Sequence, residues 1–153
     1  MLLRRARVIL VAVTVSATAA CGLTEGRQEA EAVADRYFAA IGAGDITGAL
    51  SLYSERFYKV TPREKWLEWL NDVRARCGAP KSHSQTNWKV MSSVGSNGGT
   101  RVTLVYDVRY ASCSVSETMM IFKPRGGEMQ IEGHFQKADP VDPGGAEPRE
   151  TKA

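Results

Sequence analysis

Three cysteines are the residues whose spacing says most about the chemistry open to this chain. Cys77 is expected at the end of a helix, and Cys113 in the tip between two strands. Such a thiol pair can form a disulfide, bind a metal ion or carry out redox chemistry. Redox work favours a CxxC spacing, which neither cysteine has, and two cysteines with remote histidines make a poor zinc site. We therefore predict a Cys77–Cys113 disulfide, with no metal and no cofactor.

Cys21 belongs to a different pattern, at the end of an N-terminal leader. Three arginines precede an apolar run over residues 8–15, and small residues lead into Thr18-Ala19-Ala20-Cys21-Gly22. This layout is typical of a bacterial lipoprotein signal, in which residues 1–20 are removed and the cysteine is acylated. The run is too short for a transmembrane helix, which needs about 20 residues. An ordinary secretory signal is the alternative, because Thr18 stands where a lipobox usually has Leu, Val or Ile.

Acylation of Cys21 would fix where the mature protein is found. We expect it in the bacterial cell envelope, anchored in a membrane and facing the periplasm or the exterior. Gly22, rather than aspartate, follows the cysteine, which in a Gram-negative cell resembles lipoproteins sent to the outer membrane. This compartment is oxidising, so a disulfide would persist there.

His134 is the histidine best placed for acid–base chemistry. It falls on the strand face opposite Phe135, and there it could line an apolar cup beside Asp107. A carboxylate with a histidine or a tyrosine, such as Tyr37, is what a proton-transfer enzyme needs in such a cup. The alternative, which we favour, is that Asp107 and His134 face solvent on a half-buried sheet. The other histidine, His83, is expected in a polar loop with its side chain in water.

Helical periodicity predicts the elements of the N-terminal half. Apolar residues recur at i, i+3, i+4 and i+7 over residues 28–41, and glycines end this helix. Asp45 is a good N-cap for a second, shorter helix. After a β-like run over residues 56–60, Thr61-Pro62-Arg63-Glu64 is a start signal for a third helix, which Gly78 ends.

From residue 85 the apolar pattern changes to a period of two, which predicts strands. A polar loop is expected just before them, over residues 80–84. In the last strand we expect Met129, Ile131 and Phe135 to face inward. The predicted strands cover residues 85–94, 100–110, 115–123 and 128–136.

This order of elements predicts an α+β fold, with N-terminal helices packed on a curved four-stranded antiparallel sheet. We expect one domain over residues 28–137. Residues 21–27 read as a tether for the lipid-anchored chain. The tail over residues 138–153 has prolines and glycines among charges and almost nothing apolar, so it is predicted to be disordered.

Two pairs of segments carry a resemblance to a known superfamily. The first pair, Ala34-Asp35-Arg36-Tyr37-Phe38-Ala39-Ala40-Ile41-Gly42-Ala43-Gly44-Asp45 and Ala49-Leu50-Ser51-Leu52-Tyr53, resembles the opening of the cystatin-like, nuclear-transport-factor-like cone of ketosteroid isomerases and SnoaL-type cyclases. The second pair, Glu117-Thr118-Met119-Met120-Ile121-Phe122 and Glu128-Met129-Gln130-Ile131-Glu132-Gly133-His134, resembles its closing hairpin. Among its members, the chain looks most like small uncharacterised bacterial lipoproteins. The resemblance implies a cone fold and no single function, because this cone hosts enzymes, binding modules and assembly domains.

The charge of the chain excludes one class of partner. The leader takes three arginines and no acid from 20 basic and 17 acidic residues, which leaves the mature chain without formal net charge. Nucleic-acid binding needs a basic surface, so we do not expect that partner. We predict a non-catalytic binding or assembly module, held to the membrane through Cys21, whose partner is an envelope protein or a small apolar ligand. Two alternatives remain, an enzyme of the ketosteroid isomerase or SnoaL kind and a homodimer through the open sheet face.

Overall fold

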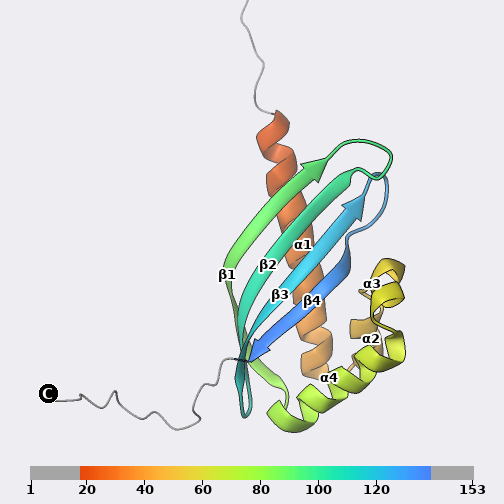
Figure 1. Ribbon diagram of the computed structural model, residues 1–153. Helices are drawn as coiled ribbons and strands as arrows, with labels where there is room; N and C mark the ends of the chain where they lie inside the picture. Colours follow the sequence, from red (N-terminus) through yellow and green to blue (C-terminus); the bar gives the residue numbers. More distant parts are fainter. Residues whose placement is uncertain (1–17, 139–153) are drawn as a thin grey trace, which may run out of the picture.

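The computed structural model describes residues 18–138 (Figure 1). Residues 1–17 of the predicted leader and residues 139–153 of the predicted tail lie outside the described residues. Ala138, expected in the tail, instead pairs with Val115 in the sheet. Helices come first and strands follow, as the sequence predicted. The helices are α1 (Thr18–Ala43), α2 (Ile46–Leu50), α3 (Glu55–Val60) and α4 (Arg63–Cys77), and the strands are β1 (Pro80–Ser93), β2 (Gly99–Tyr110), β3 (Ser114–Pro124) and β4 (Gln130–Ala138).

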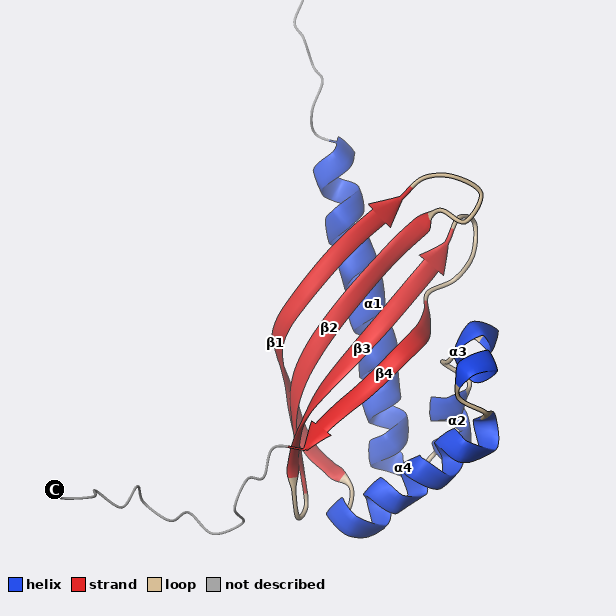
Figure 2. Ribbon diagram, in the orientation of Figure 1, coloured by secondary structure: helices blue, strands red, loops and turns tan. Residues whose placement is uncertain are grey.

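The strands form one antiparallel sheet in the order β1-β2-β3-β4. Figure 2 shows α1 lying across one face of this curved sheet, with α2, α3 and α4 grouped beside its lower end and the β4 edge. The other face carries no helix of the described chain. The α+β fold class is therefore confirmed. None of the helices between residues 18 and 138 combines the length and hydrophobicity that crossing a bilayer requires.

The core lies between α1 and the inner face of the sheet. Alternation along β2 buries every second side chain, as predicted, and the apolar stripe of α1 packs against them. A disulfide between Cys77 and Cys113 joins the end of α4 to the turn between β2 and β3, with a Cα–Cα distance of 5.2 Å. The buried inner residues of β2 are Val102, Leu104, Tyr106, Val108 and Tyr110, and those of α1 are Ala30, Val33, Ala34, Tyr37, Phe38 and Ile41.

Local capping explains how the short helices begin. Asp45 caps α2 as predicted, since its Oδ1 accepts a hydrogen bond of 2.8 Å from the backbone N of Gly48. The β-like prediction for residues 56–60 was wrong, because the Ser54 hydroxyl accepts a bond from Phe57 N and starts α3. α4 begins at Arg63, within the predicted start signal, but its N-cap is Pro62 and no side chain caps it.

The first helix and the first strand both begin earlier than predicted. α1 starts at Thr18, so residues 21–27, expected as a tether, are helical. β1 starts at Pro80, and the predicted loop over residues 80–84 is paired with the end of β2. The polar side chains there had suggested a loop. An edge strand tolerates them, because its neighbour supplies the backbone hydrogen bonds.

A bulge in β4 reverses the predicted facing of its second half. Ile121 pairs with Ile131, but Met120 pairs with Gly133, so Glu132 is an extra residue in the ladder. After this bulge His134 points inward and is buried, while Phe135 is 61% exposed. The inward prediction for Phe135 was therefore wrong, because a one-residue insertion shifts the period-two alternation.

The bulge makes a testable prediction about stability. Phe135→Thr is expected to change the free energy of unfolding by less than about 0.5 kcal/mol, as exposed substitutions usually do. Ile131→Ala, on the inner side of the same strand, should lower it by about 3 kcal/mol, because it leaves a cavity. Urea unfolding of both variants measures the difference. A loss at Phe135 as large as that at Ile131 would contradict the bulge.

Candidate functional site

The inner face of the sheet holds a buried pair of acid–base groups, Glu117 of β3 and His134 of β4. His134 Nε2 lies 2.9 Å from Glu117 Oε2, and neither side chain has any exposed surface. Their strands are neighbours, and Glu117 lies two residues before Met119, which pairs directly with His134. Adjacent strands thus bring a carboxylate and an imidazole together within the core.

The second ring nitrogen of His134 is held by Tyr53. The Tyr53 hydroxyl lies 2.7 Å from His134 Nδ1. The segment around Tyr53 is fixed against β4 because Ile131 N donates to Leu52 O and Ser54 N donates to Ile131 O, at 2.9 and 3.0 Å. Two backbone bonds therefore position this hydroxyl on the histidine.

The remaining oxygen of Glu117 is also occupied. Tyr110 of β2 donates its hydroxyl to Glu117 Oε1 at 2.5 Å, and Gln136 Nε2 donates to the same oxygen at 2.8 Å. A neutral imidazole satisfies the whole cluster, with Nε2–H donating to Glu117 and Nδ1 accepting from Tyr53. We call Tyr53, Tyr110, Glu117, His134 and Gln136 the buried network.

Aromatic side chains surround His134, and two of them carry polar atoms without a partner. The Tyr37 hydroxyl and the Trp66 indole nitrogen are buried and make no hydrogen bond with the described residues. Their rings lie 5.0 and 5.4 Å from the His134 ring, between centroids. Buried polar groups are usually paired, so these two donors mark the least satisfied part of the core.

Of the site residues named from the sequence, the structure brings together His134 and Tyr37 and leaves Asp107 apart. Asp107 is exposed on the outer face of β2, whereas His134 lies on the inner face. Glu117 is the carboxylate that meets the histidine. The sequence contained a signal for it, since Glu117 occupies the inward phase of β3 between Val115 and Met119, where a charge is buried. Tyr53 carried no such signal.

The loop expected around His83 is not found, although His83 itself is exposed as predicted. It belongs to β1, where its ring stacks on Phe38 of α1 with a centroid distance of 4.1 Å. His83 Nε2 lies 3.8 Å from Asp35 Oδ1. This contact helps to pack the start of β1 on α1 and lies outside the buried network.

A cleft of about 300 Å³ opens beside the buried network, at the end of the sheet where the disulfide lies. Both cysteines line it, with Trp69 of α4 and Gln136 of the network. Trp69 stacks on Trp66 with ring centroids 4.3 Å apart, so α4 forms an aromatic wall between this cleft and His134. Gln136 is the residue through which the cleft meets the network.

Burial raises the pKa of the tyrosines that line the core. The pKa values of Tyr37, Tyr53 and Tyr110 are raised, chiefly by desolvation, and nearby Glu117 raises them further. Burial likewise raises the pKa of Tyr106 to about 12, and that of Tyr58 above its usual range. All five tyrosines of the chain therefore resist ionisation in the folded state.

These shifts predict an alkaline transition. The unfolded chain releases its tyrosine protons near pH 10.0, while the folded chain keeps them. Stability should be complete below pH 10 and should fall as the pH rises from 10 to 12, because the unfolded state binds fewer protons there. Tyrosinate absorbance should appear together with the loss of circular dichroism. Ionisation of most tyrosines before unfolding would contradict the buried arrangement.

Neither metal ligands nor known relatives point to a function for this site. Among the residues that the structure describes, no cluster of three or more His, Cys, Asp or Glu side chains is close enough to hold a metal ion. Comparison with protein-family models, curated proteins and solved structures found no match to this chain.

Proposed function

We propose that this protein is a lipid-anchored binding or assembly module of the bacterial cell envelope and that it is not an enzyme. The observation that carries the proposal is the closure of the buried network. Glu117 and His134 have no exposed side-chain surface, and their polar atoms are taken by Tyr53, Tyr110, Gln136 and each other. A general acid or base must reach a proton on its substrate. These two groups bond only within the protein, so we assign the network to holding the sheet and helices together.

Two features of the chain support the envelope location. The leader pattern ending at Cys21 is that of a lipoprotein signal. The Cys77–Cys113 disulfide suits an oxidising compartment.

The arrangement of α1 across the concave face of the sheet favours membership of the cystatin-like, nuclear-transport-factor-like cone superfamily. We therefore propose that classification as well, as a small bacterial lipoprotein of that superfamily.

A small-ligand pocket is the second candidate, and the unpaired donors favour it. The Tyr37 hydroxyl and the Trp66 N–H are the core groups that a small polar ligand beside His134 could satisfy. The cleft at Gln136 gives such a ligand a route of entry if Trp69 moves. In this case Glu117 and His134 would bind the ligand, or would transfer protons to and from it as in an enzyme of the ketosteroid isomerase or SnoaL kind.

Native mass spectrometry of the protein, extracted gently from its own membranes, separates these proposals. We expect the mass of a chain beginning at Cys21 with its acyl groups, less two hydrogens for the disulfide, and with no retained small molecule. A retained molecule of defined mass would replace the first proposal by the second. An unacylated chain cut before Cys21 would refute the anchor. Subunit number in the same spectrum tests whether the open sheet face forms a homodimer.

A further inference from the structure

We infer that the domain rests directly on the membrane that anchors it, with the β1–β2 turn and the β3–β4 turn against zwitterionic phospholipid headgroups. This inference rests on the proposed acylation of Cys21. It follows from four observations, which are the helical link to the anchor, the position of the turns, the charges at this end of the domain, and an exposed apolar side chain at its tip.

The link between anchor and domain is part of α1 and leaves no flexible tether. Gly26 is buried against β2, and a Cβ at that position would lie 3.0 Å from Thr100 Cγ2. Cys21 precedes Gly26 by five residues in the same helix, which is a rise of about 7.5 Å. A helix keeps this distance, whereas a flexible chain would let the domain move away from the bilayer.

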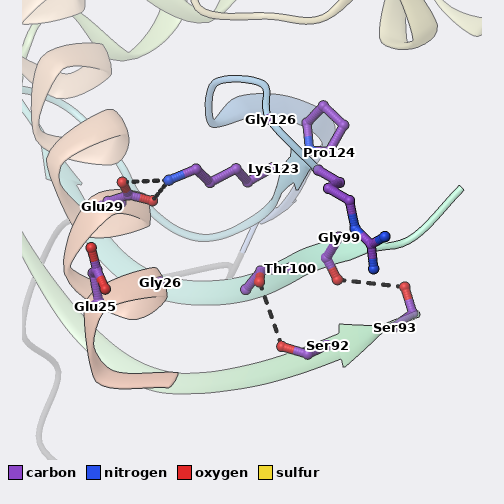
Figure 3. A pocket seen from close by; sticks show the side chains of 11 residues that line it. Glu25, Gly26, Glu29, Ser92, Ser93, Gly99, Thr100, Lys123, Pro124 and Gly126 are labelled. Carbon is purple, nitrogen blue, oxygen red and sulfur yellow. Dashed lines mark hydrogen bonds and ion pairs between the residues drawn. The ribbon is translucent and has the colours of Figure 1, made fainter. Parts of the chain in front are cut away.

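The two turns lie at the same end of the domain as the start of α1. Figure 1 shows the first turns of α1 rising beside the β1–β2 and β3–β4 connections, with α4 at the opposite end. A cleft of about 340 Å³ separates α1 from the strand ends, and Figure 3 shows Glu25 and Glu29 on its helix side and Ser92, Ser93 and Lys123 on its strand side. The anchor therefore faces the membrane together with both turns.

The charges at this end match a headgroup that carries both signs. Lys123 Nζ donates hydrogen bonds to both carboxylate oxygens of Glu29, at 2.6 and 2.7 Å, so its charge is already paired. Arg125 is exposed and has no ion pair with the described residues, and its backbone N donates to Gly98 O, which fixes it beside the β1–β2 turn. Arg125 can bind a lipid phosphate, and Glu25 across the cleft suits the ammonium group of the same headgroup.

An apolar side chain lies at the tip of the same surface. Val94, in the β1–β2 turn, is 91% exposed, and Met91, three residues earlier in β1, is 51% exposed. Exposure of apolar side chains to water is unfavourable in free energy. In the headgroup layer their apolar surface is partly removed from water, which lowers this cost. The tip thus combines an apolar side chain with polar neighbours, as an interfacial contact requires.

Fluorescence quenching in vesicles tests the inference. The mature lipoprotein is reconstituted into phosphatidylcholine–phosphatidylethanolamine vesicles that contain headgroup spin-labelled lipid. A fluorophore is placed on Val94→Cys or, as a matched control, on Asn71→Cys, an exposed position of α4 at the far end. We expect several-fold stronger quenching at position 94. A flexible Gly-Ser insertion after Leu23 should lower that quenching to the control value.

The outcomes distinguish the inference from the proposal on which it rests. The acyl mass on Cys21 is measured first on each sample, and its absence would overturn both the anchor and the membrane contact. An acylated protein with equal quenching at positions 94 and 71 would overturn the contact alone. Strong quenching that survives the insertion would overturn the geometry held by α1.

Discussion

Glu117→Ala is expected to lower the free energy of unfolding by about 3–5 kcal/mol, one of the two largest effects that we predict. The carboxylate accepts three hydrogen bonds within the core, from Tyr110, His134 and Gln136. Its removal leaves two buried donors, the Tyr110 hydroxyl and His134 Nε2–H, without an acceptor, and the half-buried Gln136 amide loses one of its two acceptors. Unpaired buried groups are costly because they have lost their water. Glu117→Gln should be milder, because the amide oxygen can still accept from some of these donors.

Asp107→Ala is the matched control for this prediction. Asp107 is also a strand carboxylate, but it is exposed on the outer face and makes no ion pair within the described chain. Its removal should change stability by less than about 0.5 kcal/mol. Urea unfolding followed by circular dichroism measures all three variants. Equal stability of the Glu117 and Asp107 alanine variants would show that the buried network does not hold the fold.

The elements that the sequence predicted well are those with a long, regular pattern. The stripe of α1 and the alternation of β2 are each repeated several times, and burial follows both. The disulfide was also predictable, because two cysteines remained in an oxidising compartment once Cys21 was assigned to the anchor. In the helix and the strand the repeated apolar pattern decides which side chains are buried, and for the disulfide the number of remaining cysteines decides the pairing.

The candidate site was harder to predict because it depends on one extra residue in β4. Glu132 shifts the phase of the strand, so His134 enters the core and Phe135 leaves it. The bulge arises from the pairing of β4 with β3, and the sequence of β4 alone does not predict it. Glu117 could have been found, because an acidic residue in an apolar phase needs a buried partner. Its true partner still depended on the bulge.

The bulge bears on function because it places the polar side chain of His134 inside the protein and the apolar side chain of Phe135 outside it. The groups that could have made a catalytic site are bonded to one another, and Phe135 is left on the helix-free face of the sheet. Fold-level resemblance to enzymes therefore carries little weight for this chain, because function depends on accessible groups. Surfaces rather than an active site are where we expect this domain to act.

Removal of the disulfide in the Cys77→Ser, Cys113→Ser double variant is expected to lower the free energy of unfolding by about 3–4 kcal/mol. The bond closes a loop over a sequence separation of 36 residues, and chain entropy in the unfolded state gives this magnitude. The native contact should survive, because Ser112 N donates to Cys77 O and Ala111 N donates to Ala79 O without the sulfurs. The effect should therefore arise mainly in the unfolded state.

Two measurements separate this origin from damage to the folded state. The unfolded chain expands when the cross-link is lost, so the dependence of the free energy of unfolding on urea should become steeper in the double variant. A reducing agent should destabilise the wild-type protein to the same extent and leave the variant unchanged. A loss below about 1 kcal/mol with an unchanged slope would mean that the unfolded chain keeps α4 and the β2–β3 turn together without the bond. The disulfide would then be a consequence of the fold and no longer one of its supports.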